Sequence, residues 1–294
     1  MDRVDLHIHS TASDGTRSPV ELVAMADKKS LSVISITDHD TLDGIREGAD
    51  AALKLGLEFI PGIELSVDLE EKGLTAHLLG YFPGADIPHL LSESHSLGKA
   101  ITYVQGGRSR RNPGILEKLA DRGMYIEMET VKLIAGGDVV GRPHIAQALL
   151  NAGYVGSMNE AFSSFLAKGK PAYVERDRLS ILRAIEVILE SGGLPVMAHP
   201  GYIEMNREKL RSLFGRMKGY GLAGIEVYYP SHSASTIAML LSFALEFQLV
   251  LTGGTDYHGM SNEAPELGGV EDGFHIKQED VRDFITLCRS HSRR

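Results

Sequence analysis

Short apolar runs recur along the chain and are separated by longer segments with helical periodicity. The runs cover residues 3–9, 31–36, 57–60, 75–81, 194–198, 224–228 and 248–251. Their length and content of Val, Ile and Leu predict seven strands. A helix is expected to start at Ser18-Pro19-Val20-Glu21, with Ser18 as the cap and Glu21 reaching back, and a second helix to span Asp43–Leu55. Strands alternating with helices predict an α/β fold with a parallel sheet or a closed, TIM-like β/α barrel.

The alternation stops between residues 86 and 175. No convincing strand occurs there, and helix-like segments at Ile115–Arg122 and Ile145–Asn151 alternate with Gly-rich turns. We therefore predict a helical substrate-binding lobe at 86–175, inserted between the fourth and fifth strands of a barrel formed by 1–85 and 176–294. This segment is rich in arginine, so it could cover a site and contact an anion.

Composition limits the chemistry. The chain has 294 residues, 43% of them hydrophobic, and a single cysteine, Cys288, so it has neither an intramolecular disulfide nor a thiolate zinc cluster. No signal-like start and no run of about 18 apolar residues is seen, so we expect a cytoplasmic protein without a membrane partner. A net charge of −9 argues against binding long duplex nucleic acid, although a local basic patch can bind a small anion.

Histidines and carboxylates gather at the ends of the predicted strands. Residues two apart on a strand project to the same side, so His7 and His9 can chelate one ion. The full set of candidate ligands is His7, His9, Asp14, His39, Glu64, His77, His199, Asp256 and His258. Nine ligands exceed the needs of one ion and predict two or three metals that share a bridging carboxylate. Taken singly, each histidine also fits a structural role, and Asp38 and Asp40 fit either partners that orient imidazoles or turn residues.

These residues form motifs that resemble those of the PHP (polymerase and histidinol phosphatase) phosphoesterases. The motifs are Asp5-Leu6-His7-Ile8-His9-Ser10, Thr37-Asp38-His39-Asp40, Gly62-Ile63-Glu64, His77, Ala198-His199-Pro200 and Thr255-Asp256-Tyr257-His258-Gly259. The resemblance covers nearly the whole chain. Gly141-Arg142-Pro143-His144 in the lobe most resembles the TrpH/YciV-like branch, which includes 3',5'-nucleotide bisphosphate phosphatases and 5'-to-3' exoribonucleases.

The resemblance implies a distorted (β/α)7 barrel with a trinuclear site of manganese, iron or zinc. By motif, His7, His9, Glu64 and Asp256 would hold the first metal; Glu64 would bridge to a second bound by His77 and His199; Asp14, His39 and His258 would hold the third. Many relatives have histidine where this chain has Asp14, and the harder ligand favours Mn²⁺ over Fe²⁺ or Zn²⁺. A metal-bound hydroxide held by Glu64, His77, His199 and Asp256 would attack phosphorus.

The resemblance also suggests residues that bind substrate. Arg142 and His144 match phosphate-binding positions, and Arg108, Arg111 and Asn112 are assigned to the same role, although the Arg108–Arg111 cluster also fits a solvated face. The expected substrates are a 3',5'-nucleotide bisphosphate or a short 5'-phosphorylated single-stranded RNA. Two alternatives stay open: a phosphatase for histidinol phosphate or another small phosphomonoester, and a noncatalytic module that binds metal or nucleotide. The sequence predicts neither the oligomeric state nor the residue that protonates the leaving group.

Overall fold

The structure is a computed structural model that describes residues 2–71, 73–90, 92, 95–137, 139–259, 265–270 and 273–292. Its strands are β1 Arg3–Ile8, β2 Leu31–Ile36, β3 Glu58–Phe59, β4 Gly62–Asp68, β5 Thr75–Tyr81, β6 Leu179–Ser180, β7 Leu194–Met197, β8 Gly224–Tyr228, β9 Val250–Gly253 and β10 Ile276–Lys277. They form two sheets, ordered β10-β1-β2-β3 and β6-β4-β5-β7-β8-β9. The α/β class is therefore as predicted.

Two isolated bridges join the sheets, and both lie at predicted ligands or beside them. One bridge pairs Ile8 with Tyr257, and the other pairs His39 with Glu64. Each bridge is parallel, as are most pairings within the sheets. The two sheets thus meet around the candidate metal ligands, while closure into a complete barrel stays a prediction.

Three strands were not predicted: β4 and the two-residue strands β6 and β10. We expected Glu64 to follow a strand at 57–60, but Glu64 lies inside β4, which pairs antiparallel with β5. The observed β3 has only two residues, Glu58–Phe59. Residues 62–67 of β4 are buried on both faces of the sheet. A strand of this kind is recognised in a sequence by a continuous apolar run, and the polar Glu64 and Ser66 interrupt that run.

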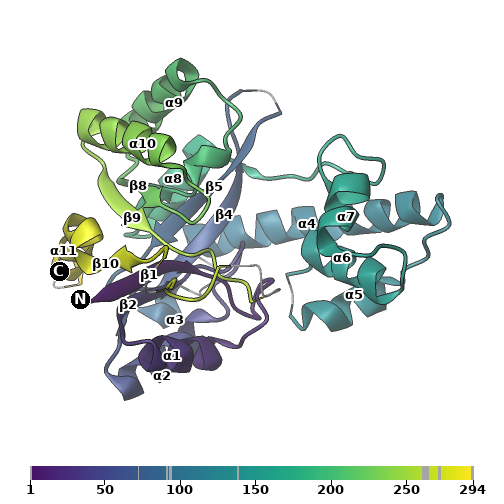
Figure 1. Cartoon of the computed structure of the whole chain (residues 1–294), viewed down its shortest axis with the longest axis horizontal. Coiled ribbons are helices and arrows are strands. Elements are labelled where there is room, and N and C mark those ends of the chain that lie inside the picture. The colour runs from purple at the N-terminus through teal and green to yellow at the C-terminus, as the bar shows by residue number, and fades with distance from the viewer. Residues whose placement is uncertain are drawn as a thin grey trace.

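Helices cover the two sheets (Figure 1). They are α1 Pro19–Lys28, α2 Ile45–Leu55, α8 Ile181–Glu190, α9 Arg207–Tyr220, α10 Ala234–Phe247 and α11 Arg282–His291, with short 3₁₀ helices η2 Pro200–Tyr202 and η3 Gln278–Val281. The predicted capping box is present at α1, where Ser18 and Glu21 bond each other's backbone N–H. α2 starts two residues later than expected and ends at Gly56, which has the left-handed conformation that glycine favours.

The short helix α3 Ile87–Leu90 contributes Leu90 to the main core. The remaining helices form a group beside the sheets (Figure 1). They are α4 Ser96–Ala120, α5 Met128–Ala135, α6 Arg142–Asn151, α7 Met158–Ala161 and the π-helix η1 Phe162–Leu166. We call residues 96–166 the helical region. Its outer part has a core of its own, in which Ile115 of α4 packs with Ile145 and Leu149 of α6. The division at 86 and 175 stays a prediction.

Helix α4 is much longer than the predicted helix at 115–122. Gly106 and Gly107 lie within it. A Cβ at Gly107 would stand 2.5 Å from the backbone oxygen of Asp177, so glycine here lets the chain that returns from the helical region pass close to α4. Leu97 and Val104, in the first half of α4, pack into the main core. None of the described helices is long and apolar enough to cross a membrane.

Candidate metal centre and arginine pocket

The predicted metal ligands come together where the two sheets meet. Among the described residues, three groups have potential ligand atoms within 4.8 Å of one another: His7, His9, Glu64 and Asp256; His9, Asp14, His39 and His258; and His39, Glu64 and His77. The first group is identical to the ligands predicted for the first metal. The second group contains the ligands predicted for the third metal, Asp14, His39 and His258, together with His9. In the last group His39 stands where His199 was expected.

Glu64 lies at the centre of the cluster and is fully buried. Its Oε1 is 2.9 Å from His77 Nδ1 and 2.9 Å from His199 Nε2. Its Oε2 is 2.9 Å from His39 Nδ1 and 3.2 Å from His9 Nε2. The two oxygens of one carboxylate therefore face different histidines, which is the arrangement that a bridging ligand needs.

Asp14 occupies the other side of the cluster. Its Oδ1 is 3.3 Å from His258 Nε2 and 3.9 Å from His9 Nδ1, and its Oδ2 is 3.9 Å from His39 Nε2. The two ring nitrogens of His39 thus face Glu64 and Asp14. His9 likewise turns Nε2 toward Asp256 Oδ1, at 3.0 Å, and Nδ1 toward Asp14.

Unpaired buried atoms test whether this cluster suits a metal. Five of its atoms are buried and face other members of the cluster without forming a hydrogen bond with them: His9 Nδ1, His39 Nδ1, His77 Nδ1, Glu64 Oε2 and Asp256 Oδ1. Buried polar groups normally have a partner, because an unpaired group loses its hydration without compensation. Imidazole nitrogens and carboxylate oxygens are ligands that manganese, iron and zinc share. The residues present therefore fit divalent metal ions.

Two groups of the cluster, Glu64 and His77, have pKa shifts that favour the protonation states that bind metals. The other histidines have raised pKa values, because neighbouring carboxylates outweigh burial: His7, His9, His39, His199 and His258. Burial alone would raise the pKa of Glu64, but the charges of His77 and His39 hold it well below its usual range. Burial lowers the pKa of His77 to about 4, although Glu64 opposes the shift. At neutral pH this leaves an ionised carboxylate beside a neutral imidazole, and metals bind those forms.

Glu226 and Tyr229 support the cluster from behind. Glu226 Oε1 lies 3.0 Å from His7 Nδ1, and its Oε2 accepts a hydrogen bond from the backbone N–H of His199 at 2.7 Å. Tyr229 donates from its hydroxyl to Asp256 Oδ2 at 2.8 Å. Neither residue was predicted. Glu226 was nevertheless detectable, because a lone carboxylate in the apolar strand at 224–228 has to find a buried partner.

Asp38 and Asp40 do not orient imidazoles, in contrast to one of the two roles considered. Asp38 accepts hydrogen bonds from the backbone N–H of Ser10 at 2.7 Å and from Ser13 Oγ at 2.6 Å, so it fixes the loop after β1. Asp40 turns away from the metal cluster and binds arginines. Burial alone would raise the pKa of Asp40, but the charges of Arg108 and Arg176 hold it well below its usual range.

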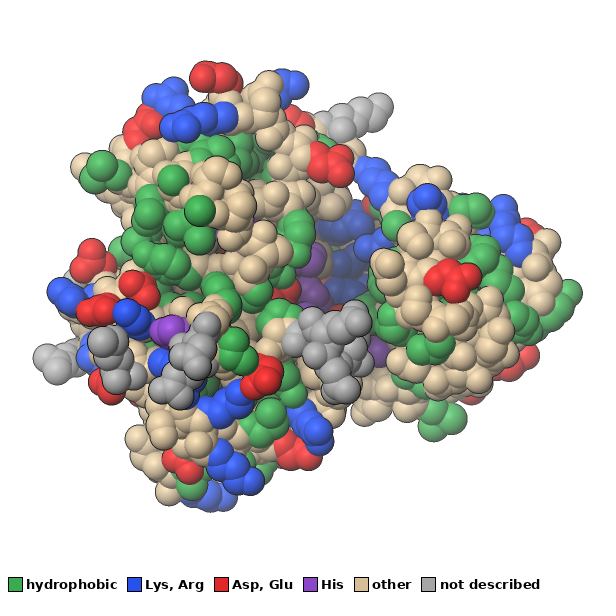
Figure 2. Space-filling model, in the orientation of Figure 1, with side chains coloured by type: hydrophobic (Ala, Val, Ile, Leu, Met, Phe, Trp, Pro, Cys, Tyr) green, Lys and Arg blue, Asp and Glu red, His purple; other side chains and the backbone are tan. Residues whose placement is uncertain are grey.

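A pocket rich in arginine adjoins the metal cluster. Its lining is Asp14, His39, Ser66, Thr75, Ala76, His77, Arg108, Arg111, Arg142, Pro143, Phe162, Arg176 and Arg178. Asp14, His39 and His77 belong to both the pocket and the metal cluster. Figure 2 shows histidine and basic side chains next to each other in the cleft between the sheets and the helical region.

The interpretation of Arg108–Arg111 as a solvated face is wrong for two of its arginines. Arg108 is only 7% exposed and Arg111 only 4%. Arg110 is exposed and pairs with the exposed Asp177. Because one turn of α4 brings Arg108 and Arg111 to the same side, both can line the pocket while Arg110 faces solvent.

Arg111 carries an unmatched charge. Its Nε and Nη2 donate to Asn112 Oδ1 at 3.1 and 2.8 Å, and Asn112 Nδ2 donates to the carbonyl of Val140 at 2.9 Å. Within the described part of the chain, no carboxylate lies within ion-pair distance of Arg111. Burial, followed by the charges of Arg108 and Arg176, lowers the pKa of Arg111 to about 8. Asn112, expected to touch substrate, instead orients Arg111 and does not line the arginine pocket.

The Gly141-Arg142-Pro143-His144 motif divides between two hollows. Arg142 lines the arginine pocket, donates from Nη1 to the carbonyl of Leu166 at 3.0 Å, and lies 5.7 Å from the ring centre of Tyr173. His144 Nδ1 accepts from the backbone N–H of Gly141 at 3.0 Å, and the ring lines a neighbouring hollow with Asp14. Arg176 and Arg178, at the end of the proposed lobe, were missed. Their only signal was the charged run Glu175-Arg176-Asp177-Arg178.

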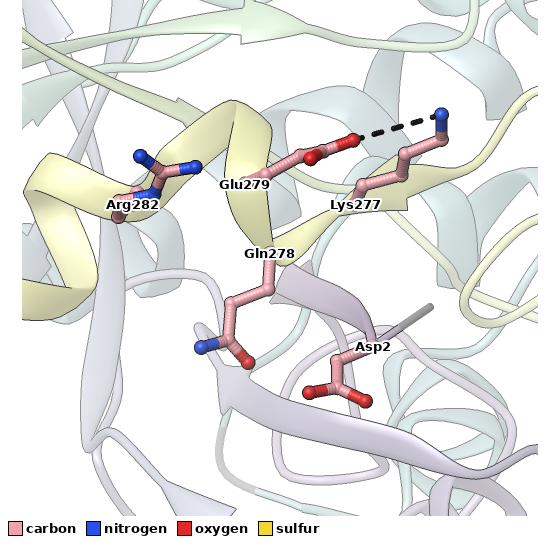
Figure 3. A pocket seen from close by; sticks show the side chains of 5 residues that line it. All are labelled: Asp2, Lys277, Gln278, Glu279 and Arg282. Atoms are coloured by element: carbon pink, nitrogen blue, oxygen red, sulfur yellow. Dashed lines mark ion pairs between the residues drawn. The ribbon is translucent and has the colours of Figure 1, made fainter.

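A separate hollow lies beside the start of β1, whereas His7 lies near the end of this strand. Asp2, Lys277, Gln278, Glu279 and Arg282 line it, from the chain before β1 and from β10, η3 and α11 (Figure 3). Lys277 Nζ and Glu279 Oε1 are 3.8 Å apart, and their side chains are partly exposed. The hollow has no histidine among its lining residues, and we assign it no role.

Comparisons with known proteins agree with this chemistry. Residues 5–161 match the model of the PHP domain. The chain is 35% identical to a 5'-3' exoribonuclease of Haemophilus influenzae over 87% of its own length and 90% of that protein. It is 30% identical to a 3',5'-nucleoside bisphosphate phosphatase of Chromobacterium violaceum, over 92% and 93%. The solved structure of an amidohydrolase from Chromobacterium violaceum, with bound sulfate and no metal, is similar with a TM-score of 0.84 and 27% identity, covering 98% of this chain and 96% of that one.

Proposed function

Because the chain belongs to the PHP family and is a metal-dependent phosphoesterase, we propose that it hydrolyses phosphate esters of nucleotides. The proposed substrates are a 3',5'-nucleotide bisphosphate, cleaved to a nucleoside 5'-monophosphate and phosphate, and a short 5'-phosphorylated RNA, cleaved from its 5' end. The observation that carries the proposal is the arginine pocket, which shares Asp14, His39 and His77 with the metal cluster. Similarity to proteins named for these two activities supports it.

The charge balance of the pocket favours a substrate with two phosphate groups. Asp40 neutralises part of the charge of Arg108 and Arg176, whereas Arg111 has no carboxylate partner among the described residues. A buried charge without a partner is costly, and a guanidinium binds phosphate oxygens through two parallel hydrogen bonds. A substrate phosphate in the arginine pocket would therefore satisfy Arg111 while a second phosphate lies at the metal cluster.

The proposed metal ligands follow the groups found in the structure. One ion would be held by His7, His9, Glu64 and Asp256, and a second by Asp14, His39 and His258. A third would be held by Glu64 and His77, with His199 or His39 completing its ligands. Divalent ions bound there would supply Lewis acid catalysis and a water of lowered pKa.

The residues around the ions position the reactants. Glu226 fixes the ring of His7 and the backbone of His199, and Tyr229 fixes Asp256. Arg111, held by Asn112, would orient the bound phosphate so that the scissile ester stays over the cluster. Orientation of this kind contributes strongly to phosphoryl transfer, because the chemistry depends mainly on position and charge.

A comparison of three substrates tests the proposal. Mn²⁺-loaded protein would be assayed for phosphate and nucleotide release from adenosine 3',5'-bisphosphate, a short 5'-phosphorylated RNA and histidinol phosphate. We expect AMP or mononucleotides, and little histidinol. A preference for histidinol phosphate would support the small-phosphomonoester alternative and contradict the proposed role of the arginine pocket. Nucleotide binding without any turnover would support the noncatalytic module.

A further inference from the structure

Another hollow, which we call the second hollow, joins the arginine pocket on the side of His77 and is distinct from the hollow beside His144. Its lining is Thr75, Ala76, His77, Ala198, His199, Tyr202 and Ile203. Thr75, Ala76 and His77 also line the arginine pocket, so the two hollows are continuous. Among the described residues, none that lines the second hollow is Lys, Arg, Asp or Glu. The cleft is therefore strongly basic on one side of the metal cluster, and the described lining on the other side consists of histidine, aromatic, aliphatic and hydroxyl side chains.

Tyr202 gives this hollow an open aromatic surface. It ends η2, three residues after His199, and is 60% exposed although it lies beside a buried cluster. Unlike the other exposed tyrosines, this ring lines a hollow that contains His77 and His199, so it offers a flat apolar face to a ligand bound at the metal cluster. Ile203, which is buried, supplies adjacent aliphatic surface.

Contacts on several sides fix the position of Tyr202. Its hydroxyl accepts a hydrogen bond from Ser231 Oγ at 3.0 Å, and its backbone N–H donates to the carbonyl of His199 at 3.1 Å. The rings of His199 and Tyr229 each lie 5.6 Å away at steep angles, 65° and 81°. A ring held in this way binds a flat partner at a lower entropic cost than a mobile ring.

We infer that Tyr202 is a stacking platform for the nucleobase of the substrate. The inference deepens the proposed function and rests on it. A substrate with one phosphate in the arginine pocket and another at the metal cluster would extend its nucleoside past His77 into the second hollow. Thr75 is the one uncharged side chain in this lining that carries a hydroxyl apart from Tyr202 itself. Because stacking uses the face of a base and not its edges, the site should accept all bases and favour the larger purines.

The test compares a substrate that has a base with one that lacks it. For wild-type protein and variants, kcat/KM would be measured for adenosine 3',5'-bisphosphate and for the abasic 1,2-dideoxyribose 3',5'-bisphosphate. We expect the ratio of the two values to fall about tenfold or more in Tyr202→Ala, as loss of base–aromatic stacking predicts. Tyr202→Phe should keep the ratio. Tyr125→Ala is the matched control, because Tyr125 is an exposed tyrosine of the helical region that lines neither hollow.

An unchanged ratio in Tyr202→Ala would overturn the inference, even if both kcat/KM values fell together, since that result would mean that Tyr202 only supports His199. Calorimetric binding of AMP and its abasic analogue separates this outcome from failure of the proposed function. If wild-type protein hydrolyses neither substrate but binds AMP more tightly than the analogue in a way that needs the ring of Tyr202, the base site stands and the proposed reaction fails. Binding without that dependence would overturn the base site as well.

Discussion

Asp40 Oδ2 accepts hydrogen bonds from Arg108 Nε and Nη2 at 2.9 and 2.6 Å. Both Nη atoms of Arg176 reach the same oxygen at 3.2 Å. Asp40 directly follows His39 and has a φ of 54°, a conformation that non-glycine residues rarely adopt. One buried carboxylate thus connects α4, the returning chain at Arg176 and the loop that carries a metal ligand. The position of the arginines is thereby coupled to the metal cluster.

Asp40→Asn should destabilise the protein at neutral pH. Removal of one partner from a buried ion pair costs about 3–5 kcal/mol. Because the pKa of Asp40 is lowered in the folded protein, its stabilisation is fully present above the unfolded value of about 3.9 and is lost as pH falls through the lower folded value. Urea denaturation at pH 7 and at pH 3 would show a larger difference between variant and wild type at pH 7.

The exposed pair of Asp177 and Arg110 provides the control for this measurement. Asp177→Asn should change the free energy of unfolding by less than about 1 kcal/mol, because water screens exposed charges. If Asp40→Asn were no more destabilising than Asp177→Asn, the connection through Asp40 would have no energetic weight.

Glu64→Gln should deplete bound metal and abolish hydrolysis together. An amide has the shape of the carboxylate but lacks the charge and the second anionic oxygen that a bridging ligand needs. Elemental analysis after dialysis, followed by phosphate release, would measure both effects. Glu58→Gln is the matched control, since Glu58 pairs with Arg289 away from the cluster. Full metal content and activity in Glu64→Gln would refute the bridging role.

Glu226→Gln tests the support behind the ligands. Glu226 contacts the ring of His7 and the backbone of His199, and neither contact involves a metal. Loss of such a partner typically lowers metal affinity about 10–100-fold. Competition with a fluorescent chelator would measure the shift. An affinity equal to that of wild type would show that the histidines hold their positions without Glu226.

Arg111→Ala should weaken the handling of substrates that carry two phosphates. Hydrogen bonds to charged groups contribute about 1.5–3 kcal/mol, so kcat/KM for adenosine 3',5'-bisphosphate should fall roughly 10–100-fold. Metal content should not change, because Arg111 is not among the candidate ligands. Arg110→Ala, one residue earlier on the exposed side of α4, should behave like wild type. Equal values for the two variants would contradict phosphate binding by Arg111.

The sequence predicted features that follow from local spacing. His7 and His9 share a face because strands alternate, and the Ser18–Glu21 capping box formed as expected. It failed where distant segments decide the outcome. Gly107 sits inside a helix because the chain at Asp177 passes over it. Arg176 comes to face Arg108 only after the chain has left and rejoined the sheets, and sequence spacing carries no information about that contact.

The number and position of bound ions test the central claim most directly. Anomalous diffraction from crystals of the Mn²⁺-loaded protein would locate each ion relative to Glu64. We predict two or three anomalous peaks within the cluster, with Glu64 contacting two of them, and phosphate release that rises as these sites fill. A fully active protein with a single ion, or with ions bound only outside the cluster, would contradict the proposed metal centre.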